Sequence, residues 1–189
     1  MGVIDSLSKR RSIYQLNKEL PVSEDEVVKT IERATELVPD AFNMKSQRVA
    51  VVMDEQNKKL WDVIYNAFGG KVAREKIDSL TAAGTVLYFY DKSAFIELQK
   101  KFALYAEHFP TWAQQSNGML QLAIWTALRD LNIGANLQHY NPIIDDAVRK
   151  MLDLPDSWVL VGQMPFGGIV AEPEAKPAED IAKRVKIYR

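Results

Sequence analysis

The longest regular stretch of the chain, residues 112–132, has the pattern of a helix that is apolar at nearly every position around its axis. Its apolar residues are Met119, Leu120, Leu122, Ala123, Ile124, Trp125, Ala127, Leu128 and Leu131. A helix with one solvated face carries a single apolar stripe, whereas one that is apolar all round is covered on every side. We therefore expect this helix in the middle of the fold or in a subunit interface. Pro110 is expected to break the pattern before it, and Gly134 to end it as a C′ glycine.

Three apolar segments rich in β-branched and aromatic residues predict strands. They cover residues 49–53, 85–90 and 158–162, and a turn is expected at 164–168. The first is apolar at every position, so we expect both of its faces to be covered. Helices are expected at 3–10, 24–38, 55–68, 71–82, 93–107 and 142–152. The predicted fold class is therefore α+β, with strands set among longer helices.

Two of these helices begin with specific signals. Ser23 followed by Glu26 forms a capping box, and Asn141-Pro142 has the N-cap-then-proline order of a helix start. The tail, residues 171–189, is less determined. It is rich in Pro, Glu, Ala and Lys, which suits disorder, but Val185, Ile187 and Tyr188 equally suit an edge strand.

Composition limits the class of protein. The 189 residues, 47% of them hydrophobic, suit a single globular domain over 1–189. The net charge of -1 argues against a nucleic-acid partner. There is no cysteine, hence no disulfide or thiolate metal site. No apolar run approaches the roughly 20 residues that span a bilayer, and the N-terminus lacks the pattern of a secretory signal. We expect a cytoplasmic protein with no membrane partner.

Several motifs of common enzyme sites are missing from the sequence. It contains no P-loop, no Gly-x-Gly-x-x-Gly after a strand and no Gly-x-Ser-x-Gly elbow. His108 and His139 are far apart and have no cysteine partners, so no metal site is expected. The carboxylates mostly lie on predicted helix faces beside Lys and Arg, where they are best interpreted as solvated surface.

Two basic clusters lie at opposite ends of the chain. Lys9-Arg10-Arg11-Ser12 places three cations beside a hydroxyl, and guanidinium forks match phosphate oxygens. Arg184 and Lys186 would share one face if the tail were a strand, and could then bind one anion together. Taken alone, each cluster is better explained as solvated surface charge.

Two polar segments lie between them. Residues 42–47 hold an amide, an amine and a second amide around one aromatic residue. Residues 137–141 bring Gln138, His139, Tyr140 and Asn141 together beside the long apolar helix. The plain interpretation is an exposed loop in the first case and a satisfied turn in the second.

Taken in order, these features resemble the nitroreductase family, which binds flavin mononucleotide (FMN), and within it the small subgroup of Frm2-like proteins of fungi and bacteria. The residues that carry the resemblance are Lys9-Arg10-Arg11-Ser12, Asp40-Ala41-Phe42-Asn43, Leu137-Gln138-His139-Tyr140-Asn141-Pro142, Met164-Pro165-Phe166-Gly167 and Arg184-Val185-Lys186. The resemblance covers nearly the whole chain. It implies a nitroreductase-like fold, with a central, mainly antiparallel sheet flanked by helices, and an intimate homodimer with a flavin in each of two interface clefts.

The resemblance also implies roles for particular residues. Those that would hold the flavin phosphate and ribityl chain are Arg10, Arg11 and Ser12, joined by Arg184 and Lys186. Asn43 would face the pyrimidine edge of the flavin, and Leu137, Gln138 and His139 would pass near its reactive N5. Two positions depart from the family: Tyr14 replaces a basic residue common among relatives, and Lys45 stands where glutamine is usual. A cation at Lys45 would favour an anionic reduced flavin.

The function implied is that of an FMN-dependent oxidoreductase working by a ping-pong mechanism. NADH or NADPH would pass hydride to flavin N5, and a nitroaromatic or quinone-like oxidant would then take it. The cofactor does the chemistry, so no catalytic protein residue is required. Two alternatives remain at this point: a flavin-binding sensor or regulatory protein with little turnover, and a dimerising interaction protein without a cofactor.

Overall fold

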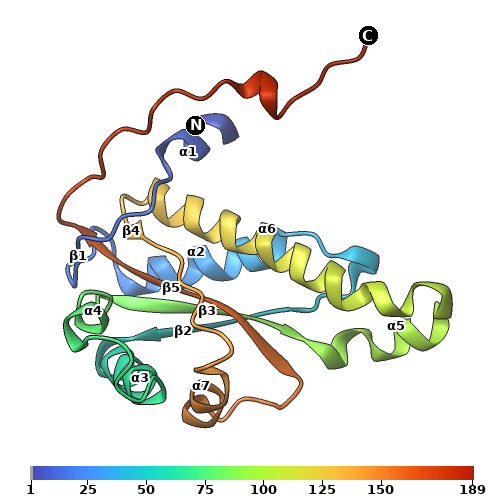
Figure 1. Ribbon diagram of the computed structural model, residues 1–189, viewed down its shortest axis with the longest axis horizontal. Coiled ribbons are helices and arrows are strands. Elements are labelled where there is room, and N and C mark those ends of the chain that lie inside the picture. Colours follow the sequence, from blue (N-terminus) through green and yellow to red (C-terminus); the bar gives the residue numbers. More distant parts are fainter. Residues whose placement is uncertain (1) are drawn as a thin grey trace.

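The computed structural model describes residues 2–189 as one antiparallel sheet between two layers of helices (Figure 1). The strands are ordered β1-β5-β3-β2, and β4 pairs with β5. All the strand ladders are antiparallel. The strands are β1 (Leu16–Asn17), β2 (Gln47–Met53), β3 (Gly84–Asp91), β4 (Gly134–Ala135) and β5 (Trp158–Ile169). The α+β fold with a mainly antiparallel sheet is thus confirmed.

The helices divide between the two faces of the sheet (Figure 1). The α-helices are α1 (Val3–Lys9), α2 (Glu24–Leu37), α3 (Asp54–Ala67), α4 (Arg74–Asp78), α5 (Ile96–Lys101), α6 (Phe109–Asp130) and α7 (Asp145–Leu152). Short 3-10 turns are η1 (Ala41–Asn43), η2 (Lys92–Phe95), η3 (Ala103–His108) and η4 (Ile181–Lys183). One core joins α2 and α6 to the sheet, and a second joins α3, α4 and α7 to its other face.

Strand β3 shows why this chain forms two cores. Val86 and Tyr88 belong to the core under α2 and α6, whereas Leu87 and Phe89 belong to the opposite core. Alternate residues of a strand point to opposite faces, so a strand covered on both sides must be apolar throughout. β2 also contributes to both cores, as its apolar sequence predicts, although it lies at the sheet edge.

Helix α6 begins earlier than expected, at Phe109, because Pro110 lies in its first turn rather than breaking it. The missing N–H of proline costs nothing there. Leu120 and Ile124 are fully buried against the sheet. On the other side, Met119 is 48% and Leu122 44% exposed. Helix α6 is therefore covered on its sheet side and leaves an apolar strip uncovered.

Strand β5 is much longer than predicted and runs straight through the expected turn at 164–168. The glycines there serve close approach of neighbouring backbone rather than a turn. A Cβ on Gly167 would lie 2.2 Å from the carbonyl oxygen of Asn17, and one on Gly168 would lie 2.1 Å from that of Glu19. Gly134 is likewise not a C′ glycine. It lies in β4, and Asn132 takes the left-handed conformation after α6 instead.

The remaining differences are shorter helices and an irregular tail. The helix expected at 71–82 is reduced to α4, and the one expected at 93–107 is divided among η2, α5 and η3. Asn141 does not cap α7, which begins at Asp145; its amide donates to Asp145 and to the Leu160 carbonyl instead. The tail after Ile169 forms no strand, and its one regular turn is η4. The Ser23 cap is confirmed: its hydroxyl accepts from the Glu26 N–H.

None of the helices within residues 2–189 is both long and apolar enough to cross a bilayer.

Candidate functional site

The N-terminal segment, residues 10–14, lies against the loop that leaves β4. Ser12 forms a parallel β-bridge with Ala135, and the Ile13 N–H donates to the Ala135 carbonyl at 2.9 Å. Asn136, which is fully buried, donates from its side-chain amide to the Ile13 carbonyl at 2.9 Å. The basic cluster and the central loop, residues 136–141, are remote in sequence but adjacent in the fold.

Gln163 of β5 holds the central loop in place. Its backbone exchanges hydrogen bonds with Gln138 at 2.7 and 3.0 Å. Its buried side chain accepts from the Tyr140 N–H and donates to Asn141, both at 3.0 Å. The loop packs over Gly162, where a Cβ would lie in ordinary contact with Leu137, Gln138 and His139 at 3.5 to 3.6 Å. One glutamine thus anchors Gln138, Tyr140 and Asn141 of the loop on the sheet.

The two arginines of the cluster have different surroundings. The Arg11 guanidinium donates to the backbone carbonyl of Glu174 in the tail at 2.8 Å. The Arg10 guanidinium instead lies over the ring of Trp125 on α6. Arg129 donates to the Lys9 carbonyl and pairs with Glu172, so the start of the tail also lies beside this segment.

The third predicted segment, residues 40–46, is a tight loop between α2 and β2. Asp40 organises it: one carboxylate oxygen accepts from both the N–H and the hydroxyl of Ser46 at 2.7 Å. Phe42, Asn43 and Lys45 have positive φ angles of 53°, 51° and 48°. Asparagine tolerates this left-handed region, whereas it is uncommon for phenylalanine and lysine. The conformation turns Asn43 and Lys45 outward, and both are exposed.

Asn43 and Lys45 lie far from the basic cluster within one subunit. The ring of Phe42 stacks on Trp112 near the start of α6, with centroids 5.6 Å apart. The basic cluster contacts the other end of α6, at Arg129. At 1.5 Å per residue, about 25 Å of helix separates Trp112 from Arg129. The fold of this chain therefore brings together Arg10–Ser12 and 137–139 but holds 43–45 apart from them.

Within residues 2–189, Arg184 and Lys186 make their polar contacts in the tail and none with the basic cluster. Arg184 pairs with Glu179 at 2.7 Å, and Lys186 donates to the Ala182 carbonyl at 3.0 Å. Both partners are in the tail itself. Figure 1 shows the tail passing α1 and ending away from the sheet. Nearly every tail residue is exposed, including Ile187 at 72% and Tyr188 at 94%.

Sequence reasoning missed Lys76 of α4. Its ammonium lies 5.7 Å from the ring centroid of Tyr14, the residue that departs from the family pattern. A cation therefore stands beside the 10–14 segment, although it comes from another helix. Burial, and then the charge of Tyr14, raise the pKa of Tyr140 above its ordinary value. Lys76 carried no local signal, because it resembles any helix-surface lysine.

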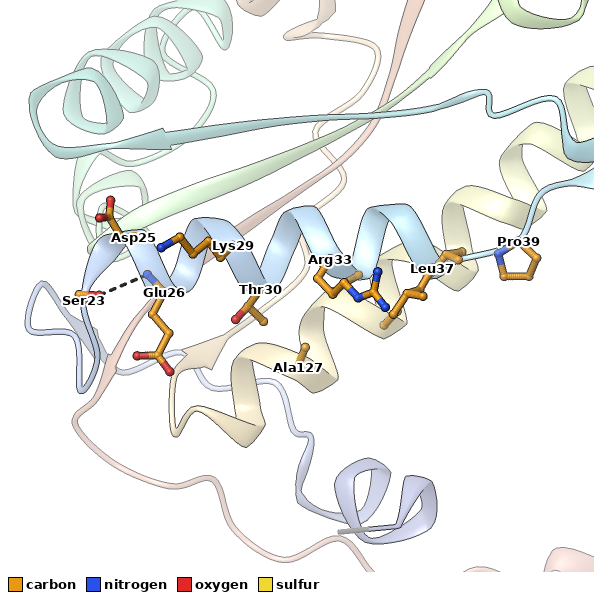
Figure 2. Close-up of a pocket in the computed structure, with 12 residues that line it drawn as sticks. Ser23, Asp25, Glu26, Lys29, Thr30, Arg33, Leu37, Pro39 and Ala127 are labelled. Carbon is orange, nitrogen blue, oxygen red and sulfur yellow. Dashed lines mark hydrogen bonds between the residues drawn. The ribbon is translucent and has the colours of Figure 1, made fainter.

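A large open hollow lies elsewhere, between α2 and α6 (Figure 2). This open groove of about 890 Å³ is lined by α2 residues such as Glu26, Thr30 and Leu37 and by Ala123 and Ala127 of α6. A second groove, about 420 Å³, lies between α1 and α6 and is floored by Met119 and Leu122. The second groove contains the uncovered strip of α6, and Ala123 and Ala127 line both grooves. Neither groove includes a predicted site residue.

A mainly antiparallel sheet between helical layers, with a basic N-terminal segment pinned to a loop over its central strand, is a nitroreductase-like arrangement. The chain of nitroreductase CinD from Lactococcus lactis, solved in complex with chloramphenicol, superposes with a TM-score of 0.94 at 39% identity, with 100% of both chains covered. A protein from Desulfovibrio desulfuricans solved in complex with FMN shares the fold, with a TM-score of 0.76 at 17% identity over 100% of this chain and 98% of that one.

The sequence comparisons agree. The nitroreductase family model matches residues 7–168. The nitroreductase FRM2 of Saccharomyces cerevisiae is 35% identical over 177 residues, which make up 92% of this chain and 91% of that protein. The chain belongs to the nitroreductase family, and its membership supports an oxidoreductase enzyme.

Proposed function

We propose that this protein is an FMN-dependent oxidoreductase that uses NADH or NADPH to reduce nitroaromatic or quinone-like acceptors by a ping-pong mechanism. FMN, when bound, supplies the chemistry of accepting hydride at N5 and passing it on. Family membership supports oxidoreduction, and a protein of the same fold was solved with FMN. CinD, 40% identical to this chain, was solved with 4-nitrophenol, which supports a nitroaromatic acceptor.

The observation that carries the proposal is the junction of the basic segment with the central loop. Arg10, Arg11 and Ser12 would hold the phosphate and ribityl chain, because they combine guanidinium donors with a hydroxyl. Leu137, Gln138 and His139 would lie along the ring near N5. The backbone of Gln138 is bonded to Gln163 and Ser12 is bridged to Ala135, so both segments are anchored to the sheet. These residues fit FMN.

The remaining predicted residues would complete the site from a second subunit. Asn43 and Lys45 would meet the pyrimidine edge of a flavin whose phosphate is held by the partner, since about 25 Å of α6 separates them from their own basic cluster. Arg184 and Lys186 would reach the phosphate after the exposed tail settles on the neighbouring chain. The homodimer would cover the apolar strip of α6 at Met119 and Leu122, which is 48% and 44% exposed here.

The proposed role of the protein residues is to bind the flavin and to orient its ring. The loop carrying Gln138 and His139 would shield one edge of the ring, and Lys45 would stabilise negative charge at the pyrimidine edge. Solvent would supply protons, so no acid–base pair is needed. The enzyme would act in the cytoplasm, where NADH and NADPH are available.

The test is purification followed by spectroscopy. We expect a yellow protein whose visible absorbance bleaches when NADH or NADPH is added without oxygen and returns when a nitroaromatic or a quinone is added. The variant Arg10→Met with Ser12→Ala should purify with little flavin. A flavin that stays oxidised with both nicotinamides would favour the sensor alternative. A colourless protein that ignores added FMN would refute the proposal.

A further inference from the structure

Arg10 and Trp125 form a stacked pair where the N-terminal segment meets α6. The guanidinium carbon of Arg10 lies 4.3 Å from the centroid of the Trp125 ring system. That separation is well within the range of a cation–π contact, for which tryptophan is the best partner. Arg10 directly follows α1, and α1 is itself tied to α6 by a 2.7 Å hydrogen bond from Ser6 to Asp130.

Each side chain of this pair has a buried N–H group without a hydrogen-bond partner in the described part of the chain. Within residues 2–189, the Arg10 side chain makes no hydrogen bond and no ion pair, and its Nε atom is buried without a partner. The indole N–H of Trp125 is buried without a partner as well. The two terminal nitrogens of Arg10 are not among the buried atoms that lack a partner. Stacking thus covers the inner part of the guanidinium and leaves its outer fork accessible and unused.

The neighbouring arginines are engaged. Arg11 donates to the Glu174 carbonyl at 2.8 Å, and Arg129 pairs with Glu172 and donates to the Lys9 carbonyl. Both thereby hold the start of the tail or the end of α1. Of these three arginines, Arg10 is the one whose charge is not already met by a carbonyl or carboxylate.

We propose that Trp125 is a positioning residue that fixes the Arg10 guanidinium for the phosphate of FMN. This rests on the proposed function. An arginine side chain loses rotamer freedom when it grips an anion. The indole platform restricts the side chain when the protein folds, so less freedom is lost when the phosphate arrives. An accessible planar fork also matches two phosphate oxygens at once.

The test compares FMN with riboflavin, which has the same ring but no phosphate. Apoprotein is titrated with each flavin, and binding is followed by the quenching of flavin fluorescence. Trp125→Leu should raise the Kd for FMN about tenfold and leave that for riboflavin unchanged. Trp125→Phe keeps an aromatic face, so the loss should be about threefold. In an Arg10→Met background, Trp125→Leu should bring no further loss.

The matched control is Trp158→Leu, which removes the ring of another contact between an arginine and a tryptophan. In that contact, the Arg48 guanidinium lies 5.8 Å from the centroid of the Trp158 ring. It should leave the FMN-to-riboflavin ratio unchanged. Thermal melts verify folding; if Trp125→Leu does not fold, the Trp125→Phe cycle with Arg10→Met decides. If Trp125→Leu weakens the binding of both flavins equally, or still weakens FMN binding in the Arg10→Met background, the role of Trp125 is overturned. The proposed function would stand in either case. A wild-type protein that binds neither flavin overturns the proposed function as well.

Discussion

The side-chain amide of Gln163 donates to the side-chain oxygen of Asn141 at 3.0 Å, while its own oxygen accepts from the Tyr140 N–H at the same distance. One buried glutamine in β5 therefore holds the end of the central loop. Gln163→Leu would leave both partners unsatisfied and should cost about 2 kcal/mol of stability. Because the loop would lie near the flavin ring, the affinity for riboflavin should fall together with that for FMN. Thermal melts and flavin titrations measure both effects.

The control for this substitution is Gln99→Leu, which removes one 2.8 Å hydrogen bond to the Ala106 carbonyl. It should leave flavin affinity unchanged. Normal flavin binding by Gln163→Leu would show that the loop does not need this anchor.

The uncovered strip of α6 predicts a dimer that depends on apolar contact. Leu122→Glu would place a charge in the proposed interface and should shift the protein toward monomer, with loss of bound flavin because Asn43 would no longer reach the partner's site. Sedimentation velocity and the visible absorbance of the same sample measure the two effects. Ile143→Glu, at a residue 53% exposed beside α7, is the matched control and should stay dimeric. A monomeric wild-type protein that retains flavin would contradict the interface.

Lys45 should make the flavin easier to reduce. A cation near the pyrimidine edge stabilises the negative charge of the reduced ring, so Lys45→Gln should lower the reduction potential by roughly 20 mV, the size expected for a partly solvated charge. Equilibrium reduction against a reference dye measures the potential. Lys92→Gln, in η2, should leave the potential unchanged. An unaltered potential in Lys45→Gln would place this lysine away from the ring.

The lowered pKa of Asp91 predicts that the protein loses stability in acid. Burial by itself would raise its pKa, but hydrogen bonds involving Ser93 and Ser157 and the charge of Arg48 outweigh it, and the net pKa lies below the ordinary 3.8. The unfolded chain therefore binds the proton first as the pH falls. The stabilisation is complete well above pH 3.8 and is lost as the pH falls through that value toward the folded pKa.

Asp91→Asn should accordingly cost about 2 kcal/mol at pH 7 and progressively less below pH 3.8. Denaturant unfolding at a series of pH values measures this difference. Asp156→Asn removes a carboxylate that is 97% exposed and paired with Arg149, and it should cost little at any pH. A cost for Asp91→Asn that stayed constant across this range would refute the electrostatic account.

Periodicity alone was enough to predict the α+β class, the two-sided strand β2 and the long apolar helix α6, because each depends on side chains close in sequence. Glycine and proline were misassigned where tertiary contacts decide. Gly167 and Gly168 indicated a turn, but they lie in β5, where the backbone at Asn17 and Glu19 leaves no room for a Cβ. Pro110 indicated a break, but it occupies a first helical turn.

In the candidate site too, some residues could be predicted from the sequence, whereas those that depend on tertiary contacts could not. The resemblance drew attention to Arg10–Ser12 and 137–139, and the fold places them together through the bridge between Ser12 and Ala135. The residues that support them had no local signature. Gln163 and Trp125 read as ordinary parts of a strand and a helix, and their roles become visible when their neighbours from distant segments are known.

In the proposed dimer, helix α6 would connect the two cofactor sites. One end meets the basic cluster of its own subunit, and the other holds the loop that would serve the partner's flavin. The length of this helix would then set the centre-to-centre spacing of the two sites, and inserting even one residue within it would rotate the two ends relative to each other by about 100°. Such a change should damage both sites together.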